Sequence, residues 1–124
     1  MVDIRYGAAI AISNGATISI ARTLSVDAYN IIDVSVPKGG PLKVTLGTPS
    51  AKMQLLVVTA AQYDEDLTYS FKSGGDAFAL DQPVILAGAG IGVAGDFSSL
   101  FFSNSVAGDP TIDVQILVAR DPLA

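Results

Sequence analysis

The sequence predicts an all-β fold, an antiparallel β-sandwich or jelly roll of about eight short strands, on three observations. Short apolar runs rich in Val, Ile and Leu recur along the whole chain. Clusters of Gly, Pro, Asn and Asp separate them, as turns separate strands. No window long enough for a helix repeats its apolar residues with a period of about 3.6. At 124 residues, the chain is expected to form one domain, 1–124.

The first expected element is a hairpin within residues 8–24, where the chain reads AAIAISNGATISIA. A two-residue turn at the Asn-Gly pair would divide the isoleucines between the two faces. A three-residue loop, 13–15, pairs Ile10 with Ile18 and gathers the isoleucines on one face. Because burial of one face fixes register, we predict this loop, with Gly15 in the left-handed region. The isoleucines concerned are Ile10, Ile12, Ile18 and Ile20.

The remaining apolar runs are expected to form short antiparallel strands. They cover residues 30–36, 42–46, 52–60, 67–72, 78–80, 84–87, 99–104 and 111–119. Segments 53–58 and 114–119 are apolar on both faces and share the pattern Gln-[Leu/Ile]-Leu-Val, through internal duplication or through chance in a β-rich chain. Two-sided apolar character predicts that both lie centrally in a sheet or against a partner.

Residues 88–95 read GAGIGVAG and contain the Gly-x-Gly-x-x-Gly spacing of dinucleotide-binding turns. That spacing binds pyrophosphate only between a strand and a helix, whose N-terminal amides meet the anion. Residues 96–102, DFSSLFF, favour a strand, and no basic residue lies between Lys72 and Arg120. We therefore expect no nucleotide or other cofactor here. The segment is interpreted as a flexible crossover whose glycines permit close packing against another backbone.

Candidate catalytic groups are few, because the chain has no His and no Cys. Ser/His/Asp and Cys/His arrangements are thereby excluded, and only Ser50 beside Lys52 offers a Ser–Lys pair, without a supporting motif. The acidic triplet 64–66 lacks an ordered calcium-loop spacing, so cation binding there stays open. Tyr63 and Tyr69 are the candidates for stacking a sugar, and packing is the expected role of both. We predict no enzyme activity, no catalytic residues and no metal site.

The composition predicts a protein that buries surface against other subunits. Charged residues make up 15% of the chain, against about 25% in ordinary soluble domains, and the mean hydropathy is +0.49. With a net charge of −5 and seven scattered basic residues, no nucleic-acid partner is expected. No apolar run approaches the roughly 18 residues of a membrane span, and no signal peptide is recognised, so we expect synthesis in a cytoplasm and no membrane partner.

Three segments carry a resemblance to a known class of proteins. They read QLLVVTAAQYDEDLTYSF, ALDQPVILAGAGIG and SLFFSNSVAGDPTIDVQILVARDP, within residues 50–122. This Gly/Ala-rich apolar texture resembles the small β-sandwich structural proteins of tailed bacteriophages. The resemblance implies a virion protein, first a head decoration (cement) protein and next a tail or baseplate component.

The leading expectation is therefore a non-enzymatic, homo-oligomeric virion protein that binds partners such as the major capsid protein. A carbohydrate- or calcium-binding β-sandwich module is the alternative. Apolar residues in the glycine segment, the following strand and the C-terminus are the expected contacts: Ile91, Val93, Phe97, Phe101 and Leu123.

Overall fold

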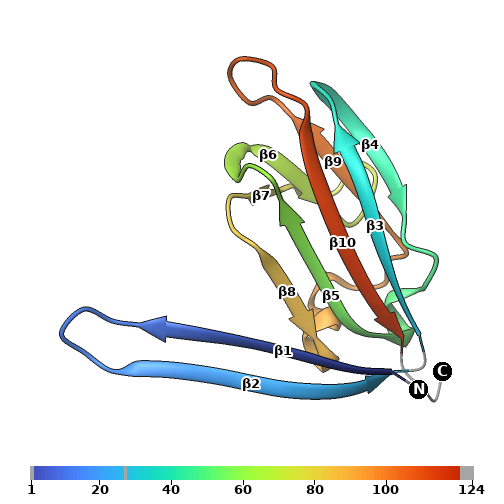
Figure 1. Ribbon diagram of the computed structural model, residues 1–124. Helices are drawn as coiled ribbons and strands as arrows, with labels where there is room; N and C mark the ends of the chain where they lie inside the picture. The colour runs from blue at the N-terminus through green and yellow to red at the C-terminus, as the bar shows by residue number, and fades with distance from the viewer. Residues whose placement is uncertain (1, 27, 121–124) are drawn as a thin grey trace.

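The computed structural model describes residues 2–26 and 28–120 and shows an all-β protein, which confirms the predicted fold class (Figure 1). Two strands, β1 (Val2–Ala11) and β2 (Thr17–Val26), form a separate hairpin, called the arm below. Eight strands form the sandwich: β3 (Tyr29–Val36), β4 (Gly39–Thr45), β5 (Met53–Ala60), β6 (Asp64–Ser70), β7 (Phe78–Leu80), β8 (Val84–Ala87), β9 (Ser99–Asn104) and β10 (Ile112–Arg120). Two 3₁₀ turns, η1 (Ser50–Lys52) and η2 (Gly88–Ala94), complete the described elements.

The sandwich has the strand order of a jelly roll. One sheet runs β3-β10-β5-β8 and the other β4-β9-β6-β7, and all neighbours are antiparallel. The pairs nest in sequence, β6 with β7, β5 with β8, β4 with β9 and β3 with β10. One long antiparallel ribbon folded over on itself gives this order, which is the two-sheet jelly-roll architecture.

The strands β5 and β10, singled out as apolar on both faces, lie side by side at the centre of one sheet, as predicted. Their inward side chains, such as Leu56 and Ile116, fill the space between the sheets. Their outward side chains include Leu55 and Ala119, which are also completely buried. Both faces are therefore apolar here because the outer face of this sheet is also covered around Leu55 and Ala119.

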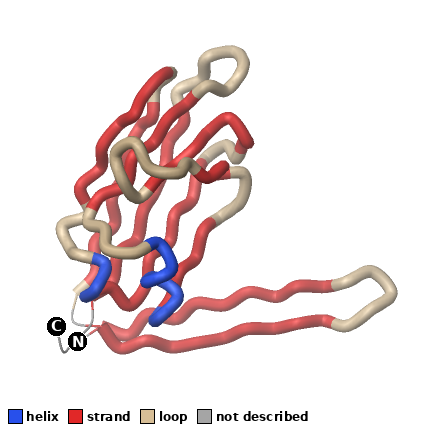
Figure 2. Tube along the Cα trace, turned by 180° about the vertical axis from the view of Figure 1, so that it is seen from behind, coloured by secondary structure: helices blue, strands red, loops and turns tan. Residues whose placement is uncertain are grey.

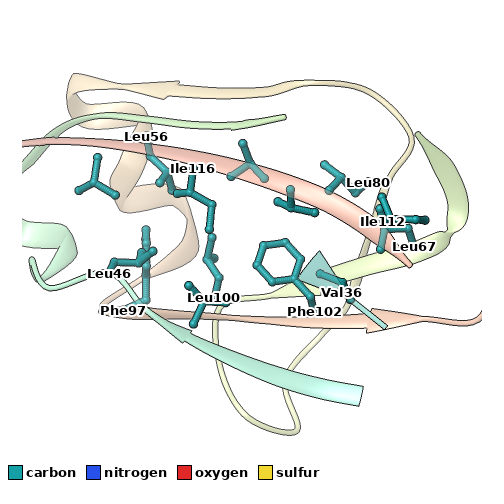
Figure 3. Close-up of a cluster of buried hydrophobic side chains, with 14 of the residues drawn as sticks. Val36, Leu46, Leu56, Leu67, Leu80, Phe97, Leu100, Phe102, Ile112 and Ile116 are labelled. Carbon is teal, nitrogen blue, oxygen red and sulfur yellow. The ribbon is translucent and has the colours of Figure 1, made fainter. Parts of the chain in front are cut away.

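The main core lies between the two sheets and is built by alternation along each strand (Figure 3). In β9, Leu100 and Phe102 point inward and are fully buried, while their neighbours are partly exposed. Asn104 follows on the same side and is 2% exposed. Its Nδ2 donates to the carbonyls of Val36 (3.1 Å) and Pro110 (2.7 Å). Its Oδ1 accepts the Val106 N–H at 3.1 Å, so one side chain links both sheets and the β9–β10 turn.

The arm has the predicted register, with Ile10 opposite Ile18 and a three-residue loop at its tip. The prediction for the loop conformation was wrong in one detail. Asn14, with φ of 58°, takes the left-handed conformation, and Gly15 does not. Asparagine tolerates this region because its short polar side chain can bond locally. The Gly15 N–H instead closes the turn on the Ile12 carbonyl at 2.9 Å.

The base of the arm packs on the outer face of the β3-β10-β5-β8 sheet. Val26 is fully buried there against Leu55 and Ala119, with Ile4 and Leu24 packed beside them. Beyond this base, the arm leaves the sandwich and projects past β8 (Figures 1 and 2). The same β-ribbon is thus anchored at one end and free of its own subunit at the other.

Candidate interaction surface

The projecting half of the arm, residues 7–21, is called the distal arm. It contains no charged residue over its whole length. One face carries Ile10, Ile12, Ile18 and Ile20, which are 51%, 53%, 50% and 46% exposed. Because directly opposed residues of a ribbon share a face, this is the same face on which Ile4 and Leu24 pack, partly buried, at the base. The face continues past the sandwich and has no partner among the described residues of the chain.

The opposite face of the distal arm is small and weakly polar. It carries Gly7, Ala9, Ala11, Thr17, Ser19 and Ala21, all exposed. Bulky and small side chains are therefore separated onto two faces of a ribbon that water surrounds. This segregation marks the isoleucine face as the surface that another molecule would cover.

A second apolar strip crosses the outer face of the β3-β10-β5-β8 sheet. In register across the four strands, Ile31 lies opposite Leu117, Leu117 opposite Val57, and Val57 opposite Ile85. Ile31 and Ile85, at the two ends, are 55% and 48% exposed, and the middle pair is partly buried. These four residues are called the outer row. The outer row lies one step along the strands from Leu55 and Ala119, which the base of the arm covers.

Beyond the outer row, on the side away from the arm, the same sheet face is polar and hollowed. An open hollow of about 530 Å³ is lined by Asp33, Ser35, Thr59, Asp113, Gln115 and their neighbours. The polar groups are largely paired with each other, since Ser35 Oγ donates to Asp113 (2.7 Å) and Gln115 Nε2 to Asp33 (3.1 Å). This face therefore changes from apolar beside the arm to acidic at the far end.

The structure corrects two of the contact residues expected from the sequence. Ile91 and Phe97 are 1% and 6% exposed and belong to the main core. They close the end of the sandwich, so their side chains have almost no surface left for a partner. Phe101, in β9, is partly exposed on the outer side of the other sheet. The side chain of Val93 and the whole of Leu123 lie outside the described residues.

The glycine segment also differs from its interpretation as a flexible crossover with tight packing. Residues 88–94 form the 3₁₀ turn η2, which contacts β5 and carries Ile91 into the core. A Cβ added at Gly90 or Gly92 would meet nothing within 4 Å, so close packing within the chain does not require these glycines. The turn instead uses positive φ at Gly88 (55°) and Gly95 (75°), a conformation that favours glycine.

The Ser50 side chain, considered for a Ser–Lys pair, has a structural partner. Its hydroxyl accepts the Phe97 N–H at 3.0 Å and is 8% exposed, whereas Lys52 is exposed. In the acidic triplet, the Asp64 carboxylate accepts the Asp66 N–H at 2.9 Å. Among the described residues, no three acidic side chains gather into a set that could hold a metal ion.

The two tyrosines occupy different positions. Tyr63 is 37% exposed. Tyr69 packs in a ring cluster, with its centroid 5.7 Å from those of both Phe71 and Phe78. Burial raises the pKa of the Tyr69 hydroxyl above its usual 10.0, and the nearby Asp81 carboxylate adds to this. Packing is therefore the role of Tyr69, as expected.

Comparison with known proteins adds no family assignment. No protein-family model, curated protein or solved structure matches the chain. Within residues 2–26 and 28–120, no helix has the length and apolar character needed to cross a membrane.

Proposed function

We propose that this chain is a non-enzymatic structural protein of a virion, which oligomerises and stabilises a capsid as a decoration protein. The observation that supports this is the distal arm, fifteen uncharged residues with an exposed isoleucine face. An exposed apolar ribbon of this kind favours aggregation unless another surface covers it. In an assembly that surface is supplied by neighbouring subunits.

The jelly roll supports the proposal without deciding it, because capsid proteins, lectins and cupins all use this architecture. The rigid sandwich would hold the arm at a fixed place on a shell, and the arm would reach across a boundary between capsid subunits. Each contact adds only the free energy left after the costs of association. Many copies on one shell would add such small gains together.

Two alternatives make different use of the same features. A tail or baseplate component would use the arm in the same way at another place on the particle. A carbohydrate- or calcium-binding module would need a polar site with free ligand groups. The hollow beside the outer row is polar, but its acids Asp33 and Asp113 already accept hydrogen bonds from Gln115 and Ser35. The distal arm has no role in that alternative.

The test is to locate the native protein with antibodies raised against the purified chain. Material from its natural source would be separated on a density gradient and examined by immunogold electron microscopy. We expect the chain in fractions of megadalton particles, at fixed stoichiometry to one shell protein, with gold on the heads. Gold confined to tails would replace the decoration role by the tail role. Recovery only among small soluble species would refute a virion role.

A further inference from the structure

We infer that the distal arm of one copy lies across the outer row of a second copy, so that the chain assembles by exchanging arms. The occupant of the isoleucine face is thus another copy of this chain. This rests on the self-assembling part of the proposed function and adds the partner and the two contact surfaces. It does not depend on where in a particle the protein is found.

The proposed contact continues one that the base of the arm already makes. The arm base shows that this ribbon face packs stably on this sheet face, because Val26, Leu55 and Ala119 are all completely buried between them. The isoleucines extend the same ribbon face outward. The outer row extends the same sheet face by one step beyond the base. Joining the two extensions repeats, between copies, a packing that already exists within one copy.

The proposed contact also covers most of the large apolar side chains that the described residues leave exposed. The large hydrophobic side chains left exposed in the described residues are Ile10, Ile12, Ile18, Ile20, Tyr29, Ile31, Tyr63, Phe78 and Ile85. The distal arm holds four of them, and the outer face of the β3-β10-β5-β8 sheet holds Tyr29, Ile31 and Ile85. Contact of arm with arm would leave the sheet residues uncovered, whereas contact of arm with sheet covers both groups.

The arm is long enough to reach a second copy, and its free face is large enough to contribute to a specific interface. At about 3.4 Å per residue, Ile18 lies about 27 Å along the strand from Val26, so it projects well clear of its own sheet. The free part of the arm presents a strip about 20 Å long and 10 Å wide, from two strands. A reciprocal pair of arms would involve four such faces, about 800 Å² before side-chain relief is added. Side chains that protrude from these flat faces add further area, which brings the total buried area toward the roughly 1,200 Å² at which specific interfaces begin.

The test uses single cysteines, because the native chain contains none. Ile18→Cys on the arm is mixed with Ile31→Cys on the outer row, one of the two carrying an affinity tag so that mixed and like pairs differ in mass. Both sites are half-exposed, so the fold should tolerate them. A disulfide needs Cα atoms within about 7 Å of each other. Because the proposed contact brings the two positions together, mild oxidation should join the two variants to each other. The matched control is Ser19→Cys, next to Ile18 on the opposite face, which should join Ile31→Cys about tenfold less.

A second measurement asks whether the outer row is needed for assembly. Ile31→Asp should reduce the mass measured by light scattering to that of the 12.7 kDa monomer. Thr45→Asp adds the same charge on the outer side of the other sheet and should leave the oligomer intact. Any one of three results would overturn the inference. These are cross-linking of Ile18→Cys only to itself, a monomeric wild-type chain, and an oligomer that Ile31→Asp leaves unaffected.

The two proposals fail separately. If the chain is found in virions but the arm does not join Ile31, the arm exchange is wrong and the virion role stands. If the arms cross-link but the chain never occurs in particles, the exchange stands and the virion role is wrong.

Discussion

Leu55→Ala is expected to release the base of the arm while the sandwich remains folded. Leu55 is fully buried on the outer face of β5, in the small cluster with Val26 and Ala119 that holds the arm. Its neighbour Leu56 is 1% exposed but points inward, into the main core. The two leucines are matched in size, strand and burial, and differ in which packing they support.

The size of the effect follows from the packing. Truncating a buried leucine to alanine costs about 2–5 kcal/mol, and we take about 3 kcal/mol for Leu55. Because this contact is broken when the arm lifts from the sheet, the equilibrium constant for lifting should rise about 100-fold. Leu56→Ala should lower the free energy of unfolding of the whole sandwich by a similar amount, and it should not affect the lifting of the arm.

Limited trypsin digestion measures both events in one sample, because the chain has only seven basic residues. Arg22 lies in β2 of the arm and reports arm opening, whereas Lys43 lies in β4 and reports opening of the sandwich. When opening is faster than cleavage, the cleavage rate follows the population of the open state. Leu55→Ala should raise cleavage at Arg22 and at Lys43 alike, by about 100-fold, because the Leu55 contact is lost both when the arm lifts and when the whole chain unfolds. Leu56→Ala should raise cleavage at Lys43 but not at Arg22, because the Leu56 contact in the main core survives when the arm lifts. Equal behaviour of the two variants would refute a separately anchored arm.

Three further outcomes are expected. Asn104→Ala removes three hydrogen bonds of a buried side chain and should lower the free energy of unfolding by about 3 kcal/mol in urea titrations, whereas loss of less than about 0.5 kcal/mol would show that water replaces them. The raised pKa of Tyr69 means that the folded state holds this proton longer than the unfolded state, so stability should be constant below about pH 10 and fall as pH rises through the raised pKa. Tyr69→Phe should remove that alkaline loss from melting curves, and an unchanged loss would assign it to another group. Millimolar calcium or a chelator should leave Tm unchanged within about 1 °C, because no three described acids gather at a site; a rise of several degrees with calcium would favour the binding-module alternative.

Local patterns predicted the sandwich strands well because each signal needs only neighbouring residues. The strand ranges 78–80, 84–87 and 99–104 match the structure residue for residue, since turn residues bound each apolar run. The strand expected at 67–72 runs instead from Asp64 to Ser70, because its acidic residues pair with β7 at Asp64 while Glu65 and Asp66 remain exposed. The nested strand order depends on contacts between distant segments, which no local pattern contains.

The contact surface was predicted less well, for a related reason. An apolar residue between glycines has the same local pattern whether it faces a partner or closes its own core, and Ile91 does the latter. The outer row becomes visible only when the registers of four strands are known, since Ile31 and Ile85 are 54 positions apart in the chain. Its central members come from β10 and β5, whose apolar outer faces the sequence did indicate.

The register of the arm is the strongest indication that a partner covers it. That register follows from requiring one face of the ribbon to be buried, yet in the isolated subunit both faces of the distal arm are exposed. A ribbon surrounded by water gains nothing from gathering its isoleucines on one side, and the exposed face is a liability. The segregation therefore indicates a second surface that covers this face.

A variant that keeps the composition but exchanges the faces tests this directly. Ala9→Ile with Ile10→Ala, and Ile18→Ser with Ser19→Ile, moves two isoleucines to the small-residue face without changing hydropathy or charge. We expect the sandwich to fold with an unchanged urea midpoint, because the distal arm contributes little to it, while the oligomer seen by light scattering is lost. If the exchanged chain assembles like the native one, apolar content alone drives association and the face carries no information. If it assembles only when the native faces are restored, the pattern of the ribbon specifies its partner.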